Sequence, residues 1–147
     1  MKTSGPWSAA QIRRFLEQSA IPLRLACSDA RGAPVVLSLW YLHRDDAFWC
    51  ATTSGARVVR ILERDPRCAF EVAGDEMPYR GVRGQARATI DAKLGEAVLK
   101  DLIRRYLGNH ETPFARWLLS RSRDEVALRI QPTRLASWDF TERMTAR

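Results

Sequence analysis

The sequence has no long apolar run and no signal-peptide pattern. No stretch reaches the roughly 18 consecutive apolar residues that a transmembrane helix needs, so we expect no membrane partner. The first residues, MKTSGPWSAAQIRRF, lack the apolar stretch of a secretory leader. We therefore expect a cytoplasmic protein.

Cysteine and histidine are also scarce. Cys27, Cys50 and Cys68 each lie in an apolar segment, and no Cys-x-x-Cys motif is present. We expect reduced core thiols rather than a disulfide framework or a zinc site. The two histidines, His43 and His110, are far apart in the sequence, and no Gly-x-Ser-x-Gly motif occurs. Neither a metal site nor a hydrolytic triad is therefore predicted.

Basic residues, in contrast, are abundant. The formal charge of +7 favours anionic partners such as phosphates, nucleotides or nucleic acid. The basic residues are spread along the chain, without a dense block or a stripe interleaved with aromatic residues. We therefore do not expect a nucleic-acid partner. The 147 residues suit one domain, and the 46% hydrophobic content is enough for a substantial core.

Hydrophobic patterning predicts a mainly β chain with flanking helices. Ser8 and Gln11 form a capping-box pattern, which predicts a helix over about 9–18. Short turns join most predicted strands, so we expect an antiparallel sheet that is closed or partly closed into a barrel. Strands are predicted at 21–29, 33–45, 47–53, 67–74, 79–91, 125–132 and 133–140, and further helices at 56–64, 92–108 and 114–120.

Residues 49–67 pass from an apolar strand through the small hydroxyl residues 52–54 and Gly55 into a short helix. Arg57 and Arg60 lie three apart, on one side of its first turns. A helix N-terminus offers free N–H groups, and arginine binds phosphate in bidentate fashion. This segment is a candidate phosphate cradle. Alternatively, a hydroxyl residue merely caps the helix and the arginines lie on a solvated face.

Four segments, in this order, carry a resemblance to a known family. They are GAPVVLSLWYLHRDDAFWCATT, TTSGARVVRILERDPRCAFEV, PYRGVRGQARATI and LRIQPTRLASWDF. They resemble, in turn, the central hairpin, the phosphate-binding segment with its following strand, the strand packed closely on the cofactor, and the closing strand. The family is the pyridoxamine 5′-phosphate oxidase-like flavin-binding split β-barrels, and the resemblance spans 21–140.

The resemblance implies a fold and an assembly. The fold would be a six-stranded antiparallel split β-barrel with flanking helices, in a homodimer. One FMN-binding domain would span 1–147, with an N-terminal helix in 1–20, the barrel and its helices in 21–140, and a tail in 141–147. Two flavin-type cofactors would lie at the dimer interface.

The resemblance also implies which residues bind the cofactor. The phosphate would lie against the cradle, the ring edge would follow the strand from Val36 to Trp40, and Trp138 of a second subunit would cover the ring. The cofactor-binding residues would be Val36, Leu37, Ser38, Leu39, Trp40, Ala51, Thr52, Thr53, Ser54, Arg57, Val58, Arg60 and Trp138. One residue departs from the family, because many relatives carry a lysine at the position of Val58. Arg57 and Arg60 would then hold the phosphate without it, or the site would be weak, altered or empty.

The implied function is FMN-dependent hydride transfer between the flavin N5 and a small conjugated substrate. No catalytic side chain is predicted, because the cofactor carries this chemistry. The chain is shorter than the oxidase that names the family, so we do not expect pyridoxamine phosphate oxidation. The alternatives are a reductase that uses an 8-hydroxy-5-deazaflavin coenzyme, a non-catalytic flavin-binding protein and, less favoured, a nucleic-acid-binding module. The deazaflavin's longer tail would need further basic groups, for which Arg83, Arg87 and Arg121 are candidates.

Overall fold

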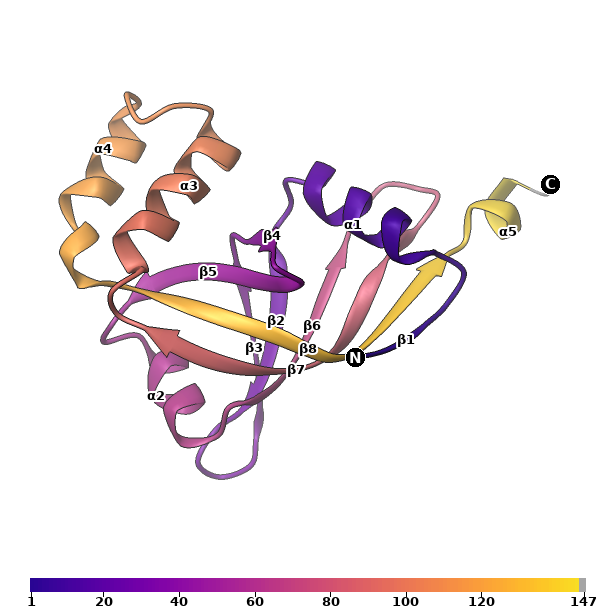
Figure 1. Cartoon of the computed structure of the whole chain (residues 1–147), viewed down its shortest axis with the longest axis horizontal. Coiled ribbons are helices and arrows are strands. Elements are labelled where there is room, and N and C mark those ends of the chain that lie inside the picture. The colour runs from indigo at the N-terminus through magenta and orange to yellow at the C-terminus, as the bar shows by residue number, and fades with distance from the viewer. Residues whose placement is uncertain (146–147) are drawn as a thin grey trace.

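A computed structural model describes residues 1–145 (Figure 1). The strands are β1 (Lys2–Ser4), β2 (Leu23–Ser28), β3 (Pro34–Leu39), β4 (Leu42–Arg44), β5 (Ala47–Thr53), β6 (Arg67–Ala73), β7 (Arg80–Asp91) and β8 (Glu125–Asp139). The helices are α1 (Ala9–Gln18), α2 (Arg57–Arg64), α3 (Gly95–Leu107), α4 (Pro113–Ser120) and α5 (Thr141–Thr145), with a 3₁₀ turn, η1, at Ser122–Asp124.

The strands form one sheet in the order β3-β2-β6-β7-β8-β5-β4, with β1 beside β8. Adjacent strands are antiparallel except β1, which runs parallel to β8. The edge strands β3 and β4 are consecutive in the chain, so the sheet curls until residues 40–41 join its two edges. This confirms the predicted mainly β fold with flanking helices.

The six strands that the family resemblance implies are too few, because the described residues form eight. The strands β1 and β4 have three residues each, too few to show an alternating pattern. The segment 33–45, predicted as one strand, breaks at Trp40–Tyr41. There the Tyr41 N–H donates to the Tyr106 hydroxyl (3.2 Å) instead of to a neighbouring strand.

The last strand was also predicted incorrectly, because 125–132 and 133–140 form a single strand, β8. Ala86 of β7 pairs with Pro132 while Gln85 pairs with Arg134, so Thr133 is an extra residue at a bulge. Proline lacks an N–H and is tolerated in sheets at such irregularities. Pro132 therefore sits within a continuous strand.

The core fills the inside of the curled sheet, and the helices close its openings. Ile12 and Leu16 of α1 and the apolar face of α2 pack against the buried strand residues. The helices α3 and α4 lie side by side beyond β5 and the first half of β8 (Figure 1). Of the predicted tail 141–147, residues 141–145 form α5, and 146–147 lie outside the described residues. Among the helices in 1–145, none offers the length and apolarity that crossing a bilayer requires.

The substitution Gly84→Ala tests how closely β7 and β8 pack. A Cβ at Gly84 would lie 2.0 Å from the Arg134 carbonyl oxygen and 2.9 Å from the Phe70 Cζ. Because main chain would have to move, we expect the free energy of unfolding to fall by about 2–3 kcal/mol. Urea denaturation measures it. Gly74→Ala is the control, since nothing lies within 4 Å of its added Cβ. Equal stabilities of the two variants would contradict the close packing.

Candidate functional site

The N-terminus of α2 has no side-chain cap. Its N-cap residue is Ala56, whereas Ser8 caps α1 and Thr112 caps α4 with side-chain oxygens. Neither Thr53 nor Ser54 therefore caps the helix, so the alternative in which a hydroxyl residue serves only as a cap is wrong. The Val59 N–H donates to the Ala56 carbonyl (3.1 Å), so the N–H groups of Arg57 and Val58 remain available to an anion, which a helix N-terminus binds well.

The loop before α2 is held by its main chain. The Ser54 N–H donates to the Asp124 carbonyl (2.7 Å), and the Ala56 N–H donates to the Thr53 carbonyl (3.0 Å). The hydroxyls of Thr52, Thr53 and Ser54 make no hydrogen bond with any residue in 1–145. The loop is therefore fixed in place. Thr52 and Thr53 are consecutive in β5 and point to opposite faces of the sheet, so only one of these two hydroxyls faces the same side as a bound ligand.

The two arginines of the cradle are held differently. The Arg60 guanidinium folds back over the loop and donates to the Gly55 carbonyl (3.0 Å). Arg57, whose side chain is 62% exposed, pairs with Asp29 at 3.3 Å. Asp29 also accepts N–H groups from Ala33 and Arg31 (2.9 Å each), and these bonds, followed by Arg57, lower the pKa of its carboxyl. An anion at the cradle would thus share Arg57 with a carboxylate, while Arg60 has no acidic partner among residues 1–145.

Val58 points away from this site. The residue is 6% exposed and packs in the core cluster inside the sheet. Val58 can therefore offer only its backbone N–H to a ligand.

A groove continues from the cradle along α2. It encloses about 310 Å³ between the helix and the β2–β3 turn, and its charged lining consists of Asp29, Arg31, Arg57, Arg60 and Arg64. The Arg64 guanidinium donates to the Ser28 carbonyl (2.7 Å), which holds it at the far end. Four arginines thus line the groove with one carboxylate, Asp29, which is already hydrogen-bonded.

The strand β3 offers unpaired main chain. It is an edge strand that pairs with β2, so the other side of its backbone has no strand partner in 1–145. Val36 is 68% exposed on the outer face, and the Ser38 hydroxyl beside it accepts a bond from Arg24 (2.8 Å). Leu37 and Leu39 pack against the core. A planar ligand along this edge would meet main-chain donors and acceptors.

Comparison with known proteins identifies the family. A sequence model described as pyridoxamine 5′-phosphate oxidase matches residues 8–139. The chain belongs to this family. Its uncapped helix, free hydroxyls and arginines fit a phosphate group of the kind that flavin cofactors carry.

Solved structures share the fold. The conserved hypothetical protein Rv2991 from Mycobacterium tuberculosis is 28% identical, with a TM-score of 0.78, over 91% of this chain and 86% of that one. An F420 reductase is 21% identical (TM-score 0.70; 83% and 94% covered). The heme storage protein HutZ from Vibrio cholerae is 23% identical, with a TM-score of 0.65, over 86% of this chain and 92% of that one. A search of curated proteins found no match.

Trp40 and Ala51, both predicted to bind the cofactor, pack against the α3–α4 pair. The Trp40 ring stacks on Tyr106 with centroids 4.9 Å apart and planes 4° apart. Ala51 belongs to the same apolar contacts, and Phe114 meets the Trp40 ring edge-on at 6.2 Å. Trp40 thus fixes the end of β3 against the helices.

Trp138 lies far from the cradle within one chain. Glu125, at the start of β8, pairs with Thr53 beside the cradle. Trp138 lies 13 residues later in the same strand, a path of about 40 Å along the extended backbone. There it packs on Phe140 (5.3 Å), and its Nε1 is buried without a hydrogen-bond partner. The structure therefore brings residues 52–60 together but leaves Trp138 apart.

The arginines suggested for a longer tail lie elsewhere. Arg83 lines a hollow with Val36, Arg87 lines another, and the Arg121 guanidinium lies over the Trp117 ring (5.2 Å).

Sequence reasoning missed Arg31 and Arg64, which line the groove. The helical spacing of 57, 60 and 64 was a usable signal for Arg64, but nothing local pointed to Arg31.

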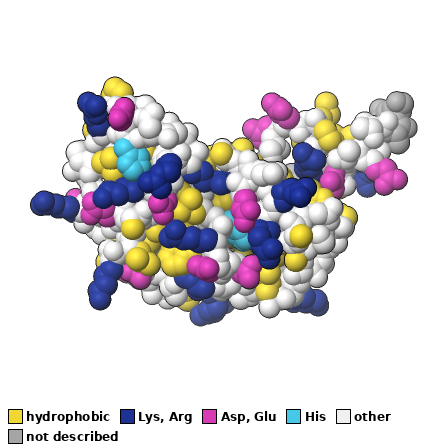
Figure 2. All heavy atoms as spheres, turned by 45° about the horizontal axis from the view of Figure 1, so that its top comes forward, with side chains coloured by type: hydrophobic (Ala, Val, Ile, Leu, Met, Phe, Trp, Pro, Cys, Tyr) yellow, Lys and Arg dark blue, Asp and Glu magenta, His cyan; other side chains and the backbone are white. Residues whose placement is uncertain are grey.

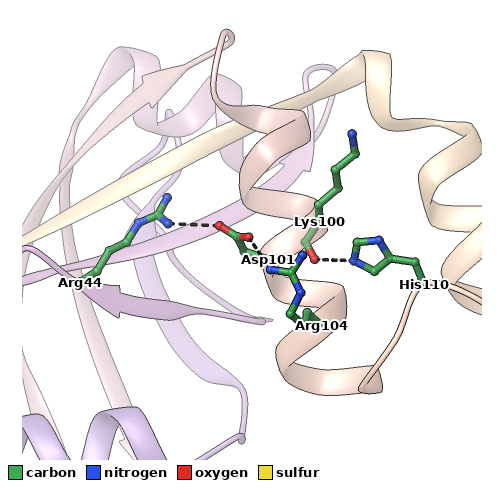
Figure 3. Close-up of polar contacts among 5 residues, drawn as sticks. All are labelled: Arg44, Lys100, Asp101, Arg104 and His110. Atoms are coloured by element: carbon green, nitrogen blue, oxygen red, sulfur yellow. Dashed lines mark hydrogen bonds and ion pairs between the residues drawn. The ribbon is translucent and has the colours of Figure 1, made fainter.

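The histidines have structural contacts. His110 Nε2 makes a hydrogen bond with the Lys100 carbonyl oxygen (3.0 Å; Figure 3). Nearby, Asp101 pairs with both Arg44 (3.2 Å) and Arg104 (3.3 Å), which links α3 to β4. His43 packs on Phe48 (5.3 Å), and burial lowers its pKa. Within 1–145, no three His, Cys, Asp or Glu side chains gather as a metal site would require.

Proposed function

We propose that the protein binds FMN and acts as a flavin-dependent oxidoreductase on a small conjugated substrate. The observation that carries this proposal is the uncapped N-terminus of α2, which follows a loop with hydroxyl residues and carries the two arginines Arg57 and Arg60. The family supports a flavin-related role. The same chain could hold a flavin without turnover, and the likeness in fold to a heme storage protein keeps that alternative open.

The residues of the chain would bind and orient the cofactor. The N–H groups of α2, hydroxyls from 52–54 and Arg60 would hold the phosphate, with Arg57 shared between phosphate and Asp29. The unpaired backbone of β3 would bond to the edge of the ring. The bound flavin would supply hydride transfer, while the protein supplies position and exclusion of water.

The site would be completed by a second copy. Two observations support this: Val36 is exposed on the outer face of β3, and Trp138 lies far along β8 from the cradle of its own chain. A homodimer with the cofactor at its interface would bring Trp138 of the other subunit to it. On the face in Figure 2, Lys and Arg are interspersed with Asp and Glu, which favours a small-molecule substrate over nucleic acid. The free thiols fit a reducing, cytoplasmic location.

One observation favours a second candidate, the 8-hydroxy-5-deazaflavin coenzyme. From Arg57 to Arg64 the arginine groove extends about 10 Å along α2, which is longer than one phosphate group. FMN ends at its phosphate, whereas the deazaflavin coenzyme has a longer, anionic tail. The groove would bind that tail.

The absorption spectrum tests the proposal. The protein is incubated with FMN or with the deazaflavin coenzyme and then desalted. A retained band near ~450 nm supports FMN, and one near ~420 nm supports the deazaflavin, as the chromophores dictate. A colourless protein after both incubations overturns the proposed function.

Replacing the far arginines separates the two cofactors. In Arg31→Gln with Arg64→Gln, we expect deazaflavin affinity to fall by about tenfold, or ~1.4 kcal/mol, because charge-assisted bonds to the tail are lost. FMN affinity should change by less than about twofold, because its phosphate stays at the cradle. Fluorescence titration measures both dissociation constants. Equal losses for both cofactors would show that the groove does not distinguish the tail.

A further inference from the structure

Cys27 and Cys68 lie on adjacent strands, each one residue beyond the last pair of β2 and β6, Ala26 and Ala69. The β2–β6 register pairs Leu25 with Phe70 and Ala26 with Ala69, so its next step would set Cys27 opposite Cys68. Both side chains join the core cluster, and the residues are 5% and 8% exposed. Opposite residues of antiparallel strands have Cα atoms about 4.5 or 5.5 Å apart, within the range of about 4.4–6.8 Å that a disulfide spans.

The two thiols are also accessible to a small reagent. The pairing of β2 with β6 stops at Ala26 and Ala69, and beyond it lies an open hollow of about 580 Å³. Cys27 and Cys68 both line this hollow, together with polar residues such as Asp65, Arg67 and Arg87. Cys50, in contrast, is fully buried and does not line it.

We propose that Cys27 and Cys68 are a modification site, a dithiol that hydrogen peroxide oxidises to a disulfide between β2 and β6. The Cys27 thiolate attacks one peroxide oxygen, the O–O bond breaks, and hydroxide leaves to give a sulfenic acid. The Cys68 thiolate then attacks the Cys27 Sγ and releases a second hydroxide. Two thiols are oxidised, one peroxide is reduced, and with the two thiol protons two waters form.

The charges around the hollow set the order and pace of these steps. Burial raises the pKa of both thiols, that of Cys68 to about 12. Arg57 and Arg64 oppose the rise at Cys27, which favours Cys27 as the first nucleophile. At Cys68, Arg87 opposes the rise, while Cys27 and Asp65 add to it. Below the pKa, oxidation should accelerate by about tenfold per pH unit as the thiolate fraction grows.

Cys27 lies two residues before Asp29, which pairs with Arg57, and Cys68 lies four residues after Arg64, the last residue of α2. The disulfide would therefore tie β2 to the strand that follows α2. Such a link would make the cradle sensitive to oxidant. The inference does not depend on flavin binding, since its geometry rests on β2 and β6 alone.

Peptide mapping tests the inference. The folded, reduced protein is treated with peroxide, quenched with acid, unfolded, alkylated and digested. We expect a mass lower by two hydrogen atoms, one alkylated thiol, at Cys50, and a crosslinked peptide pair that contains Cys27 and Cys68. A map with three alkylated thiols, a bridge to Cys50, or oxidation confined to one cysteine would overturn the inference, without any need for a variant.

Variants add a matched comparison. Cys50→Ala should form the disulfide like the wild type, whereas Cys27→Ala and Cys68→Ala should not form it. Thermal melting before oxidation shows that each variant is folded. A disulfide that disappears in folded Cys50→Ala would also count against the assignment.

Discussion

Arg57→Ala combined with Arg60→Ala is expected to weaken FMN binding by about 3 kcal/mol, roughly a hundredfold in Kd. Both guanidinium groups would bond to the phosphate by charge-assisted hydrogen bonds. The figure is lower than for two buried pairs, because both side chains are exposed and Arg57 is already paired with Asp29. Titrating FMN fluorescence with the purified, natively folded variants measures the change.

The two single variants should differ. Arg57 must share its charge with Asp29, whereas Arg60 is oriented by the Gly55 carbonyl and has no acidic partner in the described part of the chain. We therefore expect Arg60→Ala to cost more affinity for FMN than Arg57→Lys, which keeps a positive charge beside Asp29. A larger loss at Arg57→Lys would mean that Arg57 leaves Asp29 completely when the phosphate binds.

A charge-matched control separates the site from the net charge. Arg13 and Arg14 are exposed on α1, away from the groove. Arg13→Ala with Arg14→Ala removes the same two charges and should leave Kd within about twofold, since screened surface charges act weakly at a distance. If the cradle variant binds FMN as tightly as wild type, the assigned phosphate site is wrong.

The parts of the fold that depend on local signals were predictable. Ser8 and Gln11 form the predicted capping box, with Gln11 N–H donating to Ser8 Oγ (3.2 Å) and Ser8 N–H donating to Gln11 Oε1 (2.8 Å). The start of α2 was placed within one residue, at Arg57 rather than Ala56. In both cases the determining atoms lie within one helical turn of each other, so the sequence pattern contains the interaction.

What depends on distant partners could not be predicted. Whether Pro132 ends a strand depends on β7, where a bulge accommodates it. Arg31 joins Arg64 because the β2–β3 turn folds against α2, and neither segment signals the other. The same is true of Asp29, a carboxylate beside the cradle that only the fold reveals. The sequence thus predicted a helix start that carries arginines. It did not predict which other charged residues the fold brings beside them.

The expected loss of stability in Arg105→Ala rests on another long-range contact. The Arg105 guanidinium donates to three carbonyl oxygens at the end of α1: Leu16 (2.9 Å), Glu17 (2.8 Å) and Ser19 (2.8 Å). It also lies over the Tyr41 ring, 4.9 Å from the centroid. A cation at a helix C-terminus satisfies unpaired carbonyls and the helix dipole. Removing it should lower the free energy of unfolding by about 3 kcal/mol.

The neighbouring residue provides the control for this prediction. Arg104 is exposed and pairs with Asp101 at 3.3 Å (Figure 3), so Arg104→Ala should cost less than about 0.5 kcal/mol. Urea denaturation at an unchanged slope compares the two variants. Arg105→Lys should fall between them, because it keeps the charge but not the planar fork that reaches three carbonyls. Equal losses for Arg104→Ala and Arg105→Ala would mean that charge, rather than the bonds to α1, sets the effect. A larger loss at Arg105 would show that α3 holds α1 over the barrel opening.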